Sequence, residues 1–89
     1  MTDRPSDVEI GRAIDGLLAA REDDATICPS EVARALAPAD RWRDLMDDVR
    51  RVAAAEHHAG RVEVRQGGAR VDPATARGPI RLARVASPR

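Results

Sequence analysis

Two helical patterns separated by a helix-breaking turn constrain the fold of this chain more than any other feature of its sequence. The first pattern begins at Pro29, and proline suits the first turn of a helix because an N–H there would have no partner. Pro38 and Asp40 interrupt the pattern, and Asp40 is expected to cap the next helix. Over residues 41–58, apolar residues then recur every three or four positions. The spacing predicts two helices joined by a short turn, a helix-turn-helix.

The second of these helices has an apolar side and a charged side. Its apolar arc, which is predicted to face the core, consists of Trp42, Leu45, Met46, Val49, Val52 and Ala53. On the exposed side, Arg51 follows Asp47 by four residues, in the acidic-before-basic order that stabilises a helix. His57 and His58 lie in the last turn, where a cation interacts favourably with the helix dipole. Gly60 is expected to end the helix in the left-handed conformation.

Another helix is predicted before the helix-turn-helix, over residues 7–22. Ser6 and Glu9 have the spacing of a capping box, in which each side chain accepts a hydrogen bond from a free amide of the other residue. The apolar stripe that follows consists of Ile10, Ile14, Leu17 and Leu18. This helix is predicted to be a packing element.

After residue 60 the apolar period changes to two, which is typical of strands. Val62 and Val64 share one face of a first strand, and Ile80 and Leu82 share one face of a second. A loop rich in glycine, proline and arginine lies between them. Residues 25–27 can add a third, short strand.

These elements predict an α+β fold, a winged helix-turn-helix in which three helices are followed by a two-stranded β-wing. The predicted domain spans residues 6–85, with flexible tails at residues 1–5 and 86–89. A chain of 89 residues forms one small domain and leaves little room for an internal active site.

The charge of the chain is balanced overall but unevenly distributed. Its fifteen basic residues, all of them arginine, match fifteen acidic residues. Residues 1–24 hold three arginines and seven acidic residues, whereas residues 61–89 hold seven arginines and two acidic residues. The C-terminal third is therefore basic, and the arginine fork is well suited to phosphate.

The sequence gives little support for catalysis, a metal ion or a membrane. The single cysteine, Cys28, cannot form an internal disulfide, and neither a signal peptide nor a membrane-spanning apolar run is present, so we expect a cytoplasmic protein. His57 and His58 point about 100° apart on a helix and cannot chelate one metal ion together. No nucleophile with a suitably spaced base and no phosphate-binding glycine loop is found. We therefore expect a protein that is not an enzyme and that has no cofactor or metal.

Cys28 is nevertheless a candidate reactive thiol. It lies just before a predicted helix start, where free amides stabilise a thiolate. The alternative is a structural role, because cysteine is among the most frequently buried residue types.

Three motifs occur in order along the chain. They are Ile27-Cys28-Pro29-Ser30-Glu31-Val32-Ala33-Arg34, then Trp42-Arg43 with Leu45-Met46 and Val49-Arg50, then Gly78-Pro79-Ile80-Arg81-Leu82. In these motifs the chain resembles a bacterial family of small uncharacterised proteins, a domain of unknown function, over roughly residues 8–84. The resemblance implies a winged-helix fold. It implies no established activity and supplies no catalytic or ligand-binding residues.

Duplex DNA is the partner that the pattern favours first. In a helix-turn-helix the second helix enters the major groove, where Arg43, Arg50 and Arg51 can reach the DNA. The arginines of the wing region, Arg65, Arg70 and Arg77, can neutralise backbone phosphates.

Three carboxylates on the same helix argue against this interpretation. Asp44, Asp47 and Asp48 occupy the N-terminal half of its exposed side, where they repel phosphate. The alternative is therefore a protein–protein interaction module, with a protein partner or a second copy of the chain and no nucleic-acid activity. With one tryptophan and neither phenylalanine nor tyrosine, the chain has no stacking platform for single-stranded nucleic acid.

Overall fold

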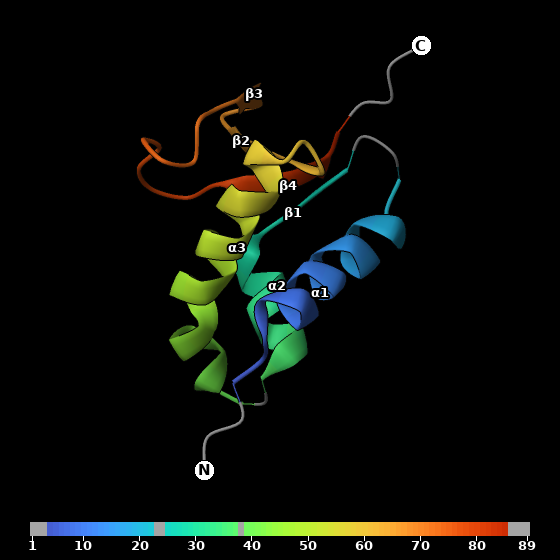
Figure 1. Cartoon of the computed structure of the whole chain (residues 1–89), viewed down its shortest axis with the longest axis vertical. Helices are drawn as coiled ribbons and strands as arrows, with labels where there is room; N and C mark the ends of the chain where they lie inside the picture. The colour runs from blue at the N-terminus through green and yellow to red at the C-terminus, as the bar shows by residue number, and fades with distance from the viewer. Residues whose placement is uncertain (1–3, 23–24, 38, 86–89) are drawn as a thin grey trace.

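Helices and strands form two layers, with the helices on one side of a small antiparallel sheet (Figure 1). The computed structural model describes residues 4–22, 25–37 and 39–85, and these residues contain three α-helices and four strands. In chain order the elements are α1 (Asp7–Ala19), β1 (Thr26–Ile27), α2 (Pro29–Leu36), the 3-10 helix η1 (Arg41–Leu45), α3 (Met46–His58), β2 (Val62–Gln66), β3 (Ala69–Arg70) and β4 (Arg81–Arg84). Residues 1–3 of the tail expected at residues 1–5, the tail expected at residues 86–89 and the helix break expected at Pro38 lie outside the described residues.

Helix α1 begins as predicted and ends earlier than predicted. The capping box is present, because the Glu9 amide donates to Ser6 Oγ at 3.2 Å and the Ser6 amide donates to Glu9 Oε1 at 2.9 Å. The helix ends at Ala19 rather than at about Glu22. Arg84 of β4 donates to the carbonyl oxygens of Leu18 and Arg21 at 2.6 and 3.1 Å. A cation from the sheet is thus placed at the C-terminal end of the helix, where the helix dipole is negative.

The helix predicted over residues 41–58 consists of two parts. Residues 41–45 form the 3-10 helix η1, and the α-helical conformation begins only at Met46. The prediction that Asp40 caps this helix is wrong, because its side chain makes no capping hydrogen bond. Instead the Arg43 amide approaches the Asp40 carbonyl oxygen at 3.5 Å, the i to i+3 spacing of a 3-10 turn, which is common at helix ends. Gly60 has a φ of 79°, so the predicted left-handed end is confirmed.

The sheet has four strands in the order β1-β4-β2-β3, so the prediction of a two-stranded wing is wrong in its strand number. The third strand expected near residues 25–27 is confirmed, because Thr26 and Ile27 pair with Ala83 and Leu82. The additional strand β3 pairs with β2 through a turn at Gly67 and Gly68. Both glycines have positive φ, 61° and 83°, as a tight two-residue hairpin requires.

The core lies between the helices and the inner face of the sheet. Its fully buried large residues include Ile10, Ile14, Ile27, Val32, Val49, Val62, Val64 and Leu82. The predicted apolar faces of α1, α3, β2 and β4 are therefore confirmed. Trp42 and Met46 are half-buried and pack against the edge of this core. In the described part of the chain, no helix combines the length and apolar character needed to cross a membrane.

Candidate nucleic-acid interface

The loop between β3 and β4, residues 71–80, is held through its main chain by side chains outside it. Gln66, at the end of β2, donates through Nε2 to the carbonyl oxygens of Arg77 and Pro79. Arg50 of α3 donates through Nη2 to the carbonyl oxygen of Gly78 at 3.3 Å. One predicted site residue, Arg50, is thereby placed beside the loop segment that carries another, Arg77.

The other end of this loop is attached to the last turn of α3. Asp72 Oδ1 accepts a hydrogen bond from the Ala74 amide at 2.9 Å and lies 3.4 Å from His58 Nε2. The Ala74 amide, and after it His58, lower the pKa of the Asp72 carboxyl. The loop is therefore fixed to α3 near both of its ends.

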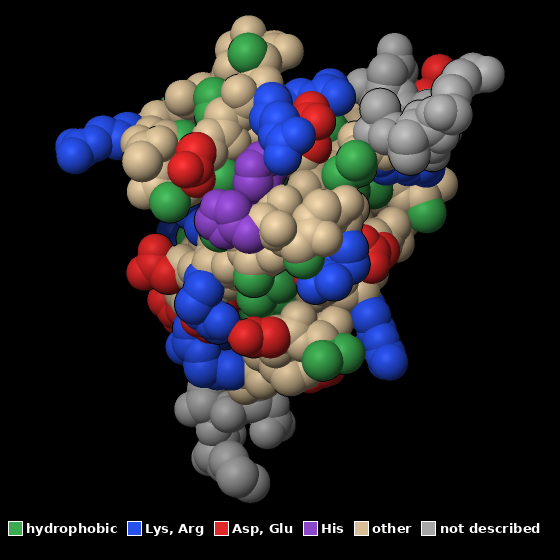
Figure 2. Space-filling model, turned by 45° about the horizontal axis from the view of Figure 1, so that its top comes forward, with side chains coloured by type: hydrophobic (Ala, Val, Ile, Leu, Met, Phe, Trp, Pro, Cys, Tyr) green, Lys and Arg blue, Asp and Glu red, His purple; other side chains and the backbone are tan. Residues whose placement is uncertain are grey.

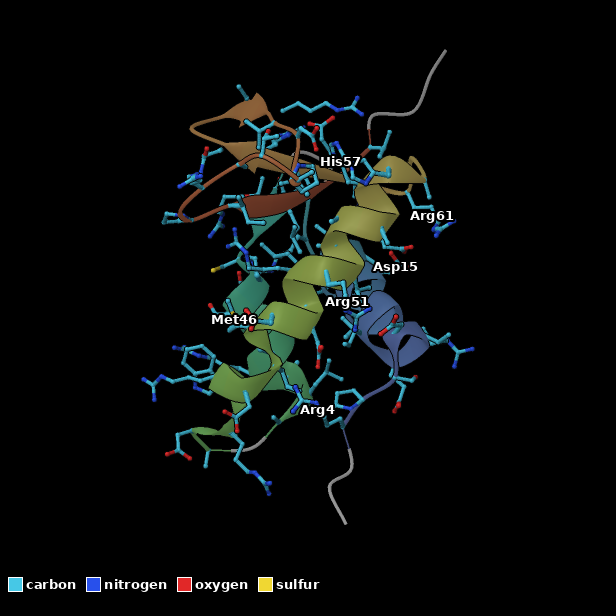
Figure 3. The ribbon with its side chains drawn as sticks, turned by 60° about the vertical axis from the view of Figure 1, so that its left-hand side comes forward. Arg4, Asp15, Met46, Arg51, His57 and Arg61 are labelled. Carbon is cyan, nitrogen blue, oxygen red and sulfur yellow. The ribbon has the colours of Figure 1, made fainter. Side chains whose placement is uncertain are left out.

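His57 lies where the end of α3 meets the sheet, and its role was missed in the sequence. It is buried, with 7% of its surface exposed, and Nδ1 accepts a hydrogen bond from the Val64 amide at 3.1 Å (Figure 3). The carbonyl oxygen of Val64 accepts a hydrogen bond from the Val71 amide at 3.0 Å. The Val64 amide bonds to the imidazole instead of to a carbonyl oxygen beyond the end of β3. The interpretation of His57 as a helix-end cation is wrong, because this geometry requires an unprotonated Nδ1. Burial, and after it the charge of Arg70, lowers the pKa of His57.

Arg51 is directed toward α1 and away from the loop. Its guanidinium binds both carboxylate oxygens of Asp7 at 2.8 and 2.9 Å and approaches Asp48 at 3.4 Å. Arg4 binds the same Asp48 at 2.8 Å, and Figure 3 shows Arg4 and Arg51 on the opposite side of α3 from Met46. Hydrogen bonding to Asp7 raises the pKa of Arg51, and hydrogen bonding from Arg4 lowers the pKa of Asp48. The predicted partner of Arg51, Asp47, is not among the residues that it contacts.

Arg43 lies over the indole ring of Trp42, with its guanidinium carbon 4.9 Å from the ring centroid. Arg34 of α2 lies over the same ring at 4.4 Å. Both guanidinium groups therefore make cation–π contacts with the Trp42 ring at the junction of α2 and η1. This cluster is separate from the loop that Arg50 contacts.

The remaining predicted arginines lie in β2, in β3 and in the loop. Arg65 pairs with Glu63, with Nε 2.5 Å from the carboxylate. Arg70 and Arg77 are exposed, and neither pairs with a carboxylate within the ranges that the structure describes. Arg70 and Arg81 are the direct cross-strand partners of Arg65 on its two neighbouring strands. Arg81 was not selected from the sequence, although the alternation around Leu82 places it on the open face.

The face shown in Figure 2 carries charges of both signs, with the histidine side chains (purple) lying among basic and acidic groups. A separate groove of about 400 Å³ lies between α1 and α3, where Val8, Val52 and Ala55 form its apolar lining. Asp15 and Glu56 border this groove; burial, and after it the charge of Glu56, raises the pKa of Asp15. Among the described residues, no three His, Cys, Asp or Glu side chains gather in a way that can hold a metal ion.

Cys28 is half-buried at the start of α2. Its sulfur accepts a hydrogen bond from Ser30 Oγ at 3.1 Å, and its amide donates to Glu31 Oε2 at 2.8 Å. The hydrogen bond from the Cys28 amide, and after it the guanidinium of Arg21, lower the pKa of the Glu31 carboxyl. Reactivity of the thiol stays a prediction.

The comparisons with known proteins address the family and leave the activity open. Residues 7–85 match a protein family described as "Protein of unknown function (DUF3253)". No curated protein matches the chain. The match covers nearly the whole chain and confirms the resemblance to a domain of unknown function. The chain therefore belongs to the DUF3253 family of proteins of unknown function.

Proposed function

We propose that this protein is a cytoplasmic winged-helix domain that acts by binding, not by catalysis, and that its partner is duplex DNA. The order of elements supports the winged-helix assignment. A short strand lies between the first two helices. Two longer strands, β2 and β4, follow the third helix and pair with each other, and β4 also pairs with the short strand. In this assignment, β2, β3, β4 and the loop of residues 71–80 form the wing, and α3 is the helix beside it.

The observation that carries the DNA proposal is the hydrogen bond from Arg50 to the carbonyl oxygen of Gly78. It brings an arginine of α3 beside the segment that carries the exposed Arg77, and the exposed Arg70 lies on β3, which pairs with the strand that carries Gln66. Contacts between exposed arginines and DNA phosphates supply affinity and do not depend on the base sequence. Asp44 on η1 and Asp47 on α3 remain exposed, and Arg51 is paired with Asp7, so base reading by α3 is disfavoured. We therefore expect weak, salt-dependent binding with little sequence preference.

A duplex titration at two salt concentrations tests the proposal. Each phosphate contact contributes about 0.9 to the slope of log affinity against log salt. Replacing Arg70 and Arg77 with alanine should lower that slope by up to about 2. The matched control is Arg12→Ala with Arg41→Ala, which removes the same charge from exposed positions on α1 and η1. If the wild-type protein shows no duplex binding at low salt, the proposal is wrong.

A protein–protein interaction module is the second candidate, and the groove between α1 and α3 favours it. Val8, which lines the groove, is a large apolar residue with 62% of its surface exposed. Apolar lining with charges of both signs around it suits a protein partner or a second copy of the chain. Two results together would favour this candidate. The protein would not bind duplex at low salt, and light scattering would show a dimer that Val8→Asp converts to a monomer.

A further inference from the structure

Three arginines on adjacent strands lie side by side on the open face of the sheet. The strands β3, β2 and β4 are neighbours, and Arg65 on β2 is paired directly with Arg70 on one side and Arg81 on the other. Side chains at directly paired positions leave the sheet on the same face. The residues next to Arg65 and Arg81 along the strands, Val64 and Leu82, are fully buried against the helices. The arginine row, Arg70, Arg65 and Arg81, therefore faces away from the core.

This arrangement is unfavourable for the isolated protein. Like charges directly opposite each other on neighbouring strands destabilise a sheet. In the described part of the chain one carboxylate, that of Glu63, pairs with the row, and it pairs with Arg65. Arg81 instead donates to the hydroxyl and the carbonyl oxygen of Thr26 at 2.9 and 3.1 Å, which are neutral acceptors. The carboxylate of Glu31, which is already paired with Arg21, also interacts with Arg81 at longer range. Three guanidinium groups therefore have one directly paired carboxylate, and an excess positive charge remains on this strip of the sheet.

The spacing of the row suits a line of phosphates. Neighbouring strands lie about 4.8 Å apart, so the row extends over roughly 10 Å. One strand of duplex DNA advances about 3.4 Å along the helix axis for each phosphate, so a row of this length that runs parallel to the axis passes about three phosphates. The row is also continuous with the proposed wing contact, because Arg81 follows the loop segment 77–79 that Arg50 and Gln66 hold.

We propose that the arginine row is a phosphate-binding surface of this protein and takes the sugar–phosphate backbone of duplex DNA on the open face of the sheet. The inference rests on the proposed function. It adds Arg81, and a continuous surface centred on the already predicted Arg65, to the contact made by the wing loop and α3. In this arrangement the sheet and wing, rather than α3, supply most of the contacts to DNA. The arginine side chains provide paired N–H donors that match phosphate oxygens.

The test is the double variant Arg65→Gln with Arg81→Gln, titrated with a short duplex at about 50 and 200 mM salt. The slope of log affinity against log salt should fall by about 1.8, so the salt-induced loss of affinity should be about 12-fold smaller than in the wild type. Arg65→Lys with Arg81→Lys keeps the charge and should restore most of the slope. Far-UV circular dichroism and a melting curve establish that each variant is folded, and the single variant Arg65→Gln avoids disturbing the contact of Arg81 with Thr26.

The outcomes separate this inference from the proposed function. The wild type can bind the duplex while the folded glutamine variants keep the same slope of log affinity against log salt. That result refutes phosphate binding by the arginine row and leaves the proposed wing contact intact. Absence of wild-type binding overturns both. Poly-glutamate and unlabelled duplex, at equal total charge, can also be compared as competitors of the bound duplex. Equal competition would assign the row to an acidic protein segment and refute the DNA assignment.

Discussion

Replacing His57 tests the most unusual contact of the fold. The Val64 amide is buried and donates to His57 Nδ1 at 3.1 Å, at the point where β2 loses β3 as its partner. His57→Leu fills a similar space and removes the acceptor. Leaving a buried amide without a partner costs about 1–3 kcal/mol. For a chain of this length, each kcal/mol lowers the melting temperature by about 4–8 °C.

The same residue should make stability depend on pH. Because the pKa of His57 is lowered in the folded protein, the unfolded chain binds a proton more readily near neutral pH. The stabilising contribution is therefore complete above the unfolded pKa of about 6.5 and is lost as the pH falls through the folded pKa. The groups facing His57 act in both directions, since Arg70 and His58 lower its pKa while Asp72 and Glu63 raise it. Carboxyls with lowered pKa values lose their contributions separately, below about pH 4.5.

Urea denaturation at about pH 7.5 and about pH 5.5 measures both effects. His57→Gln keeps an acceptor for the Val64 amide and should lose less stability than His57→Leu at the higher pH. Both variants should lose the part of the pH dependence that belongs to His57. His58→Leu is the matched control and should change stability at the higher pH by no more than about 0.5 kcal/mol, because its ring is exposed. A His57→Leu protein as stable as the wild type, with the same decline toward pH 5.5, would refute the reasoning.

Two further variants or modifications examine the core and the thiol. Ile14→Ala truncates a fully buried side chain of α1 and should lower the free energy of unfolding by about 2–5 kcal/mol. Val8 on the same helix is exposed, so Val8→Ala should change that free energy little. Equal effects of the two variants in urea denaturation would contradict the assigned core. Alkylation of Cys28 should be slow in the folded protein and should accelerate in denaturant, since the thiol is half-buried; rapid alkylation of the native protein would instead support the reactive-thiol hypothesis.

Periodic features of the sequence predicted the core correctly. Ile10, Ile14 and Leu18 recur at helical spacing, and Val62 and Val64 alternate, so each set can face only one side of its element. The short strand near residues 25–27 was also predicted, whereas its pairing with β4 is known only from the structure. Burial imposes these patterns locally, which is why they are visible before any tertiary contact is known.

The features that sequence reasoning missed depend on contacts between distant segments. His57 is buried beside the sheet and accepts a hydrogen bond from the Val64 amide. The position of a histidine in the last turn of a helix does not indicate such a contact. Arg51 binds Asp7, forty-four positions away, in preference to the nearby Asp47. The strand β3 consists of two exposed residues, Ala69 and Arg70, which are too few to show alternation. For the candidate interface, the sequence supplied the arginines, and the fold alone determines which of them lie together.

The main-chain attachment of segment 77–79 affects which substitutions this loop can accept. Gln66 and Arg50 hold the carbonyl oxygens of Arg77, Gly78 and Pro79, and a carbonyl oxygen is the same in every amino acid. The path of the segment is therefore specified from outside it, apart from the glycine that its positive φ favours at position 78. New side chains at position 77 can be displayed on an unchanged support, which makes this tip a natural place to graft or evolve a different preference.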